Sequence, residues 1–241
     1  MTRSMFSIAT RRRRPELMDQ PGLDDREHAR ALSGLGRINV VSRTAAALWP
    51  SLAKLAREQP QGAGPLRVLD VATGGGDTAV ALARRAERSG LAIEIDGCDL
   101  SAQAVAIARD RAAAQGSRVR FFALDALAAP IPEGYDVLVC SLFLHHLDED
   151  DAVLLLRRMA AAANRLVLVD DLARSRMGCW LAWIACYTLS RSRVVRYDGP
   201  VSAAAAFTPA EALDLARRAG LEGVTIRRHW PQRFLLSWSR P

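Results

Sequence analysis

The chain has 241 residues, half of them hydrophobic, which is enough for one large domain or two small ones with a substantial core. Its formal net charge is +7, and almost all of the positive charge is arginine, spread along the chain without interleaved aromatic residues. We therefore expect no nucleic-acid partner. No uninterrupted apolar stretch is long enough to span a bilayer, so we expect no membrane-spanning segment.

The cysteine and histidine content bears on metal binding and on location. The four cysteines form no CxxC pair and only four histidines are present, so we predict no metal site and a reducing, cytoplasmic location. The basic run Arg11–Arg14 is not followed by an apolar segment, and we therefore expect a solvated tail rather than a signal peptide.

Residues 1–60 are predicted to form a tail and a helical cap rather than a separate domain. Apolar residues from Leu35 to Leu55 recur at helical spacing, which indicates one or two helices. We expect an interruption at Trp49-Pro50, because the residue before a proline avoids the helical region. Gln59 to Pro65 is rich in turn formers and is predicted to be a linker.

Residues 61–241 begin with a regular alternation of strands and helices. Strands are predicted at residues 66–72, 91–98, 118–124, 135–141 and 165–169, and helices at residues 78–88, 101–115 and 149–163. Alternation of this kind predicts an α/β fold, a doubly wound and mostly parallel sheet with helices on both faces.

The last third of the chain has a different pattern. Residues 172–206 contain no clear strand and include the apolar stretch Met177–Leu189, which we interpret as an insertion that covers the substrate. Thr208–Ala219 is a helix whose second residue is proline. Residues 221–229 and 233–238 are two strands separated by Pro231, a spacing that suits a hairpin at the edge of the sheet.

The first predicted strand leads into three glycines. Gly74, Gly75 and Gly76 lack Cβ atoms, so the turn can adopt positive φ and a ligand can lie against its backbone. Asp77 is a plausible N-cap of the next helix, whose first N–H groups favour an anionic group. The stretch is therefore the predicted centre of a binding site.

Acidic and polar residues follow the other strands. In an open parallel sheet, ligands bind beyond the carboxyl ends of the strands, where the strand order reverses. Asp99 and Asp125 follow the second and third strands, Ser141 and the pair His145-His146 end the fourth, and Asp170 and Asp171 follow the fifth. Carboxylates there suit a nucleoside: Asp99 can accept both ribose hydroxyl protons, and Asp125 can accept from an adenine amino group.

These stretches resemble the class I S-adenosylmethionine-dependent methyltransferases. The resemblance lies in Leu-Asp-Val-Ala-Thr-Gly-Gly-Gly (69–76), Gly-Cys-Asp-Leu-Ser (97–101) and Phe-Ala-Leu-Asp-Ala (122–126). Ala72 replaces the usual first glycine, which we expect to require a negative φ there. The resemblance implies S-adenosylmethionine as cofactor and a Rossmann-like seven-stranded sheet with an antiparallel last strand. The residues assigned to the cofactor are Arg37, Asp70, Ala72, Thr73, Gly74, Gly76, Asp99, Leu100, Asp125, Ala126 and Ser141.

Two alternatives to this interpretation stay open. Gly74-x-Gly76-x-x-Ala79 loosely fits a nicotinamide dinucleotide fingerprint, although Asp70 inside the strand and Asp125 do not suit it. Asp99 precedes a helix, and capping of that helix alone would explain this residue.

Arg37 and Asn39 are candidates for contact with the methionine end of the cofactor, where an arginine could pair with the carboxylate. The alternative is a surface arginine on an amphipathic helix.

His145 and His146 are the candidate catalytic residues. They lie just past the fourth strand, where the transferable methyl group is expected, and histidine suits removal of a proton from a phenol-like oxygen. The alternative is a structural pair, with one histidine buried against the sheet and the other capping the helix of residues 148–151.

The acceptor pocket is predicted to lie between residues 172–206 and the N-terminal cap. One helical face carries aromatic and apolar residues that we assign to the substrate, together with His146: Trp180, Trp183, Ile184 and Tyr187. An ordinary core helix and a peripheral membrane-surface helix are the alternatives, because arginines flank the stretch.

The prediction from sequence is methyl transfer to a small hydrophobic acceptor, at an oxygen of a phenolic or polyketide-like compound of secondary metabolism. Carbon methylation of a quinone ring is second, a nicotinamide-dependent oxidoreductase is the rival class, and RNA methylation comes third, since no basic-aromatic surface is visible. A cofactor-binding protein without activity is the non-enzyme alternative. The sequence leaves a monomer and a homodimer open.

We expect Asp99→Ala to weaken the binding of S-adenosylmethionine by about 1–3 kcal/mol, because the ribose hydroxyls would lose their acceptor. Isothermal titration calorimetry measures this, and an unchanged affinity would remove Asp99 from the site.

Overall fold

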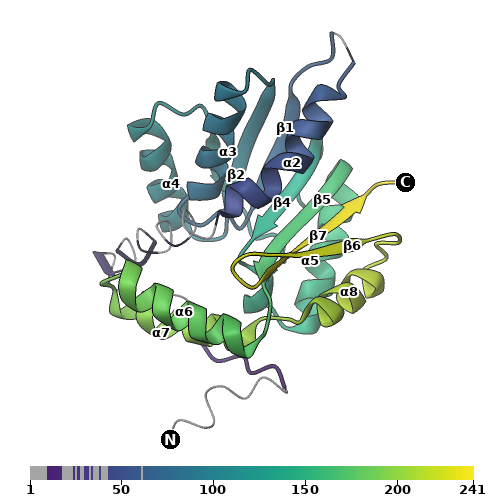
Figure 1. Cartoon of the computed structure of the whole chain (residues 1–241). Helices are drawn as coiled ribbons and strands as arrows, with labels where there is room; N and C mark the ends of the chain where they lie inside the picture. The colour runs from purple at the N-terminus through teal and green to yellow at the C-terminus, as the bar shows by residue number, and fades with distance from the viewer. Residues whose placement is uncertain are drawn as a thin grey trace, which may run out of the picture.

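A seven-stranded sheet with helices on both faces forms the body of the protein (Figure 1). The structure is a computed structural model, and it describes residues 10–17, 24, 26–27, 30–32, 34, 38, 43–60 and 62–241. All statements about the fold refer to these residues. The Rossmann-like architecture predicted from the alternation of strands and helices is confirmed.

The sheet has the order β3-β2-β1-β4-β5-β7-β6. Its strands are β1 (Leu66–Val71), β2 (Ile93–Asp99), β3 (Arg120–Ala123), β4 (Tyr135–Ser141), β5 (Ala163–Leu172), β6 (Thr225–His229) and β7 (Arg233–Ser239). The first five strands are parallel, and β7 is antiparallel to both β5 and β6. The strand order reverses between β1 and β4, which is where a ligand crevice is expected.

Each face of the sheet is covered by helices with an apolar side. One layer holds α2 (Thr44–Arg57), α3 (Asp77–Arg88) and α4 (Ala102–Ala114), and its core includes Leu48, Leu52 and Leu82. The other holds α5 (Glu149–Ala162) and α8 (Pro209–Arg218), with Leu155 and Leu215 in its core. The parallel strands are buried on both sides, which explains their nearly continuous apolar sequences.

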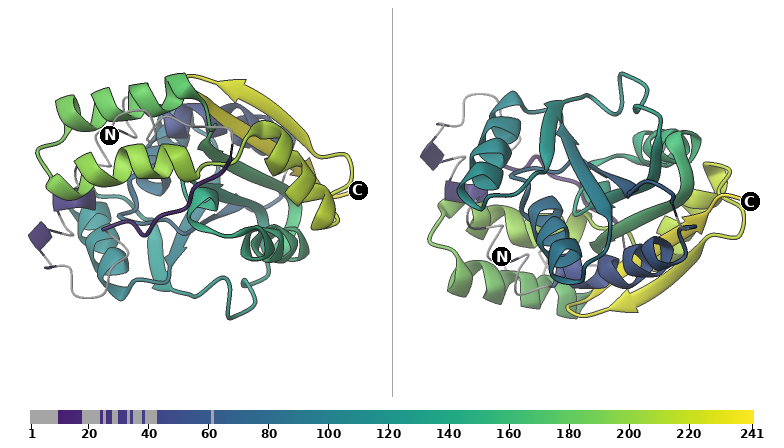
Figure 2. Two further views of the ribbon diagram at one scale, coloured as in Figure 1. Left: turned by 90° about the horizontal axis from the view of Figure 1, so that it is seen from below. Right: turned by 90° about the horizontal axis from the view of Figure 1, so that it is seen from above.

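A helix pair lies beyond the carboxyl edge of the sheet. It consists of α6 (Arg176–Leu189) and α7 (Arg193–Ala205), joined by a short turn, and residues 10–17 run across this same end (Figure 2). β5 extends to Leu172, and residues 173–206 contain no strand, as predicted. Their interpretation as an insertion that covers the substrate stays a prediction. A short 3-10 helix, η1 (Leu144–His146), follows β4 and faces this pair.

The helix before the sheet corrects one prediction. We expected Trp49-Pro50 to interrupt it, but α2 continues through Pro50 to Arg57. The proline lacks an N–H and so costs one intrahelical hydrogen bond. Burial of Leu48, Leu52 and Ala53 on the sheet keeps the helix intact across it. The described residues between 26 and 38 are helical, and the helical cap predicted for residues 1–60 stays a prediction.

The terminal hairpin is locked by a buried ion pair. Arg233 on β7 is 1% exposed and donates to Asp170 on β5 at 2.8 Å and to Thr44 on α2 at 2.7 Å. His229 Nε2 lies 2.8 Å from the other Asp170 oxygen. We expected Asp170 to follow β5 and face a ligand, but it lies inside the strand and ties three elements together.

We expect Arg233→Met to lower the free energy of unfolding by about 3–5 kcal/mol, because it leaves the buried Asp170 charge without its main partner. Urea denaturation at neutral pH measures the change. Arg227→Met on the exposed side of β6 is the matched control and should be within about 0.5 kcal/mol of the parent. Equal stabilities of the two variants would contradict a structural role for the ion pair.

Candidate active site

Two strained residues mark the point where the strand order reverses. Ala72 follows β1 with φ of 55°, and Leu142 follows β4 with φ of 56°. A residue with a Cβ atom in this left-handed region costs about 1–2 kcal/mol. Our expectation of a negative φ at Ala72 is therefore wrong, because the chain must turn sharply there to enter the glycine turn. Strain of this kind concentrates at functional sites.

The glycine turn uses its glycines for two purposes. Gly74 and Gly76 have φ of 55° and 72°. A Cβ atom at Gly76 would lie 2.7 Å from Phe121 and 2.8 Å from Ala108, so this glycine allows α3 to pack closely. At Gly74 the nearest atom, from Leu32, is 4.0 Å away, which leaves the backbone approachable.

The start of α3 also differs from the prediction. Gly76 is the N-cap and has no side chain to cap with, while Asp77 is the first helical residue. The Asp77 carboxylate lies 3.4 Å from Arg111 on α4. Asp77 therefore complements the positive end of the helix and links α3 to α4 instead of capping.

Asp70 supports the turn from beneath. It is fully buried in β1, and its Oδ2 accepts a hydrogen bond of 2.7 Å from Thr73 Oγ1. Its Oδ1 is buried without a hydrogen-bond partner among the described residues. Burial is the main cause that raises the pKa of Asp70 to about 7, and the nearby Asp77 and Asp99 add to it. An orphaned carboxylate oxygen under a glycine turn is what a donor-bearing ligand would satisfy.

Asp99 joins the end of β2 to the glycine turn. One carboxylate oxygen accepts from the N–H of Gly74 at 2.8 Å and the other from the N–H of Ser101 at 2.9 Å. The N-cap of α4 is Ser101, whose hydroxyl accepts from Ala104. Capping therefore does not explain Asp99. Leu100, beside it, is 69% exposed, which leaves an apolar surface next to the carboxylate.

The remaining predicted cofactor residues lie along the same edge. Asp125 follows β3 and accepts from the N–H groups of Leu127 at 2.8 Å and Ala128 at 3.0 Å. Ala126 packs against the core, and Ser141 is the last residue of β4. Positive-φ glycines, an orphaned buried oxygen, an exposed leucine and two carboxylates fit a nucleoside with an amino-acid tail. Arg37 and Asn39 lie outside the described residues.

His145 is held by a carboxylate from the neighbouring strand. It is 3% exposed, and its Nδ1 lies 2.6 Å from Asp171 Oδ1. Its backbone N–H donates to Asp171 Oδ2 at 2.8 Å. Burial raises the pKa of Asp171, but the contacts with His145 and the backbone outweigh this and hold it below its ordinary value. An ionised Asp171 orients the ring and leaves Nε2 directed away from the strand.

Of the predicted histidine pair, His146 is the more exposed, and neither histidine caps α5. His146 has a side-chain exposure of 23%, and its ring centroid lies 4.4 Å from that of His145. The N-cap of α5 is Asp148, which accepts from the N–H of Asp151 at 2.9 Å. The structural alternative for the pair is thus half right, since His145 is buried against the sheet.

Sequence analysis missed Glu16, which reaches the histidines from the N-terminal segment. Glu16 Oε1 lies 4.0 Å from His145 Nε2 and 3.8 Å from His146 Nδ1, and it accepts from Ser202 Oγ on α7 at 2.6 Å. Only a fold-level contact joins these residues, so local sequence held no signal for it. The three groups could ligate a metal ion, their ligand atoms lying within 4.8 Å of one another. A tetrahedral ion would draw them to about 3.4 Å, closer than the observed spacing.

Arg11 fastens this segment over the site. Its guanidinium donates to the backbone oxygens of His145 at 2.9 Å, Leu147 at 2.5 Å and Ala205 at 2.6 Å. It also lies 3.7 Å from the centre of the Phe207 ring. The segment that was predicted to be a solvated tail is therefore bound at this residue, because four partners compensate the buried charge.

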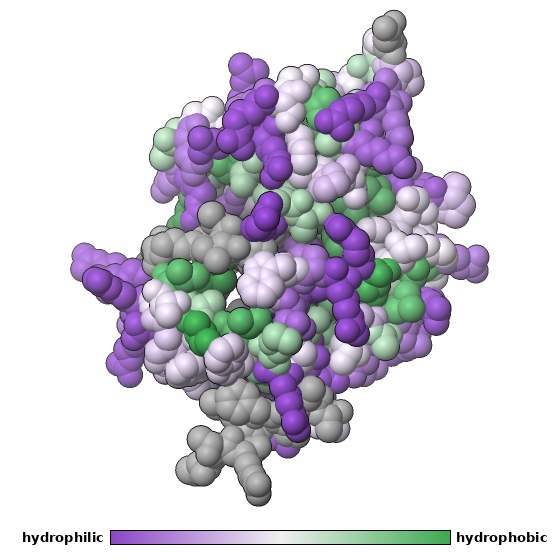
Figure 3. Space-filling model, viewed as in Figure 1, coloured by the Kyte–Doolittle hydropathy of each residue, from purple (hydrophilic) through white to green (hydrophobic). Residues whose placement is uncertain are grey.

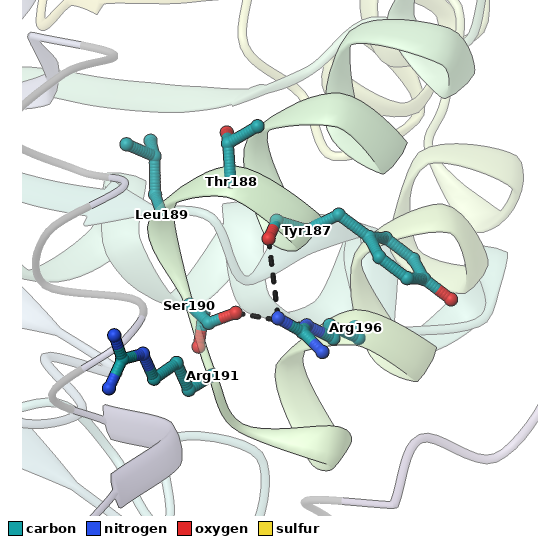
Figure 4. A pocket seen from close by; sticks show the side chains of 6 residues that line it. All are labelled: Tyr187, Thr188, Leu189, Ser190, Arg191 and Arg196. Carbon is teal, nitrogen blue, oxygen red and sulfur yellow. Dashed lines mark hydrogen bonds between the residues drawn. The ribbon is translucent and has the colours of Figure 1, made fainter.

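The aromatic face of α6 is largely exposed, so its assignment to the acceptor stays a prediction. Trp180, Trp183 and Tyr187 are 56%, 41% and 47% exposed, and Ile184 is half-buried. A hollow of about 360 Å³ lies at the far end of α6, lined by Tyr187, Thr188, Leu189, Ser190, Arg191 and Arg196 (Figure 4). It is polar and separate from the histidine pair. The buried side of α6 carries Cys179 and Cys186 instead.

Comparison with known proteins defines the class. Residues 68–165 match the family described as methyltransferase domain. This stretch carries the glycine turn, Asp99, Asp125 and the histidine pair. Residues 68–165 are therefore similar to methyltransferase domains, and the resemblance to S-adenosylmethionine-dependent methyltransferases that the sequence indicated is confirmed over this stretch.

Individual relatives narrow the comparison. The chain is 40% identical over 108 residues to a demethylmenaquinone methyltransferase of Thermus thermophilus, covering 44% of this chain and 47% of that protein. It is similar to the structure of the S-adenosylmethionine-dependent methyltransferase SibL, with 25% identity, a TM-score of 0.58, and coverage of 81% and 57% of the two chains. A putative O-methyltransferase from Nostoc punctiforme shares the fold, at 21% identity, a TM-score of 0.63 and coverage of 98% and 66%.

Asp70→Asn should stabilise the cofactor-free protein in a pH-dependent way. The carboxyl loses its proton near pH 4 when unfolded but only near pH 7 when folded, so parent stability falls between these values and is flat above. The variant lacks this penalty. Its advantage should grow from near zero at pH 4 to at most about 4 kcal/mol above pH 7, since one pKa unit corresponds to about 1.4 kcal/mol.

Urea denaturation from pH 4 to pH 8 measures this difference, with Asp110→Asn on exposed α4 as the control. If the stability difference between Asp70→Asn and the parent did not change with pH, the pKa of Asp70 would not be raised in the folded state.

Proposed function

We propose that the protein transfers a methyl group from S-adenosylmethionine to a hydroxyl oxygen of a small hydrophobic aromatic compound. Several observations support this: the match to the methyltransferase family, the fit of the glycine turn and its carboxylates to the cofactor, and a histidine–aspartate pair at the same edge of the sheet. The family match favours this reaction over the nicotinamide-dependent alternative.

The residues around the glycine turn would hold the cofactor. Asp99 and Asp125 face the edge where its nucleoside would lie, Leu100 offers an apolar surface to the base, and Asp70 lies beneath the turn at Gly74. S-adenosylmethionine supplies a methyl group that its sulfonium already activates. The protein therefore has to align the acceptor, exclude water and remove one proton.

The pair of His145 and Asp171 is the observation that carries the proposed reaction. Asp171 accepts from Nδ1–H at 2.6 Å, so the neutral ring presents the lone pair of Nε2 on its other side. That nitrogen can take the proton of an acceptor hydroxyl, and the Asp171 carboxylate stabilises the resulting imidazolium. Glu16 Oε1, from the N-terminal segment, lies 4.0 Å from the same nitrogen.

Carbon methylation of a quinone-derived ring is the second candidate. A demethylmenaquinone methyltransferase is among the relatives, which favours it. The match covers less than half of that protein, and residues 172–206 of this chain lie outside the stretch that matches the methyltransferase family. A hydroxyl on the ring must lose its proton in either reaction, so the histidine pair serves both. The methylated atom distinguishes them in the product.

The acceptor would enter between α6, α7 and residues 10–17. Arg174, buried near this opening, donates to the oxygen of Ala206 at 2.8 Å and to Glu211 at 2.6 Å, so it braces the wall rather than meeting the acceptor. His146 is the exposed member of the pair and the better placed to contact the acceptor. The cytoplasmic location and the choice between monomer and homodimer stay predictions.

We expect His145→Ala to lower kcat for an ordinary phenol by about 10²–10⁴-fold, because it removes the proton acceptor. Asp171→Asn should lower kcat in the same direction by disturbing the ring orientation. The loss should largely disappear with an acidic nitrophenol, which is already ionised at neutral pH. Transfer of labelled methyl to each acceptor measures the rates, and nuclear magnetic resonance of the product identifies the methylated atom.

A chelator should leave the activity of the parent unchanged if His145 acts as a base. His146→Ala is the paired comparison on the adjacent residue. Wild-type turnover of both histidine variants with the ordinary phenol would refute the proposed proton transfer.

A further inference from the structure

The outer side of α6 carries a stripe of exposed aromatic residues. Trp180, Trp183 and Tyr187 share it with Arg176, and at 100° per residue the four positions span about 60° of the helix circumference. The rings of Trp183 and Tyr187 lie 4.9 Å apart. Exposed tryptophans gathered on one stripe are unusual on a protein surface and mark an interaction site.

A neighbouring side of α6 packs against α7, so the exposed stripe is not the side of the helix that faces the core. Cys179 and Cys186 are buried there. A Cβ atom at Gly199 of α7 would lie only 2.1 Å from Cys186 Sγ, which shows how closely the two helices pack. Packing of the inner side of α6 therefore holds the aromatic stripe outward. Figure 3 shows the outer surface, on which pale and green residues gather over α6.

The terminal hairpin carries a further exposed tryptophan near the start of α6. Trp230, in the turn between β6 and β7, is 64% exposed. This turn lies against the start of α6, because Ser175 Oγ donates to Gln232 Oε1 at 3.1 Å. The docking face, as we call it, thus consists of Trp180, Trp183, Tyr187 and Trp230.

The charged residues of α6 and its flanking turns are all of one sign. Residues 172–197 contain five arginines and no aspartate or glutamate. Arg174 is buried in its ion pair with Glu211, and Arg196 donates to the oxygens of Ser190 and Tyr187. The other three, at the two ends of α6, are exposed: Arg176, Arg191 and Arg193.

The hollow at the arginine end of α6 fits the same ligand chemistry. Tyr187, Arg191 and Arg196 line it, and the Arg196 guanidinium lies 5.1 Å from the centre of the Tyr187 ring (Figure 4). Its volume of about 360 Å³ and its polar lining suit an anionic headgroup rather than an apolar ring.

We propose that the docking face binds the surface of a bilayer that contains anionic lipid. Tryptophan and tyrosine rings between arginines are the composition of helices that lie in a membrane interface. α6 has 14 residues, and no helix among the described residues has the length and hydropathy needed to cross a membrane. Docking goes beyond the proposed reaction and does not depend on it.

Docking would also place the acceptor opening against the lipid. α6 begins four residues after β5 ends, and the backbone N–H of Arg174 donates to the oxygen of Phe207, the residue under Arg11. The docking face and the histidine pair therefore belong to the same end of the sheet. A hydrophobic acceptor dissolved in the bilayer would reach the site without crossing water.

The test is flotation of the full chain with vesicles of phosphatidylcholine alone or mixed with phosphatidylglycerol. We expect binding to the mixed vesicles, weakened by salt, with a blue shift of tryptophan emission. Trp180→Ser with Trp183→Ser should weaken binding at least about tenfold. Neutralising Arg176, Arg191 and Arg193 to glutamine should weaken it about a hundredfold.

Matched controls separate the docking face from net charge and from misfolding. Glutamine at Arg88, Arg118 and Arg217, which are exposed elsewhere, removes the same charge and should retain most of the binding. The arginine variants lie on the surface and should keep the parent melting temperature, so they test the proposal even if the tryptophan variant unfolds. Equal loss in both arginine sets would overturn it.

Two other outcomes would also overturn the proposal. One is failure of the parent to float with mixed vesicles. The other is a dimer in analytical ultracentrifugation that dissociates on Trp180→Ser, which would assign the docking face to a second copy of the chain. Loss of methyl transfer without loss of flotation would instead count against the proposed reaction alone.

Discussion

Two adjacent buried carboxylates on β5 control how the carboxyl edge of the sheet is assembled. Successive side chains of a strand point to opposite faces. Asp170 meets Arg233 and His229 from the terminal hairpin, while Asp171 meets His145 after β4. Each charge is buried only because another element brings a donor to it. Asp170 thus fixes the terminal hairpin to the sheet, and its neighbour Asp171 orients the candidate base. The hairpin and the site therefore both depend on adjacent buried charges of β5.

The N-terminal segment completes the site from the far end of the chain. Arg11 satisfies backbone oxygens of η1 and of the end of α7, and Glu16 lies between the two histidines and Ser202. The N–H of Leu17 adds a bond of 2.8 Å to Asp198 on α7. These contacts surround the histidine pair with fixed dipoles and charges. A reaction that needs alignment and dryness more than chemical assistance benefits from such a cover.

Sequence alone was sufficient where the signal was local. Strand periodicity, the glycine turn and the acids after β2 and β3 located one side of the site, since a parallel sheet brings consecutive strand ends to one edge. It failed where tertiary packing decides. Burial of Leu52 keeps α2 helical on both sides of Pro50. The sharp turn of the chain after β1 requires a positive φ at Ala72. Glu16 approaches His145 only through the fold, and the exposure of Trp180 depends on which side of α6 faces α7.

The close packing at Gly199 restricts what this position can hold. A side chain there would collide with Cys186, so the contact between α6 and α7 requires a glycine. On the same helix, Asp198 accepts from the N–H of Leu17, and Ser202, one turn further along, donates to Glu16. The helix that packs against α6 therefore also holds the carboxylate that lies beside the histidines.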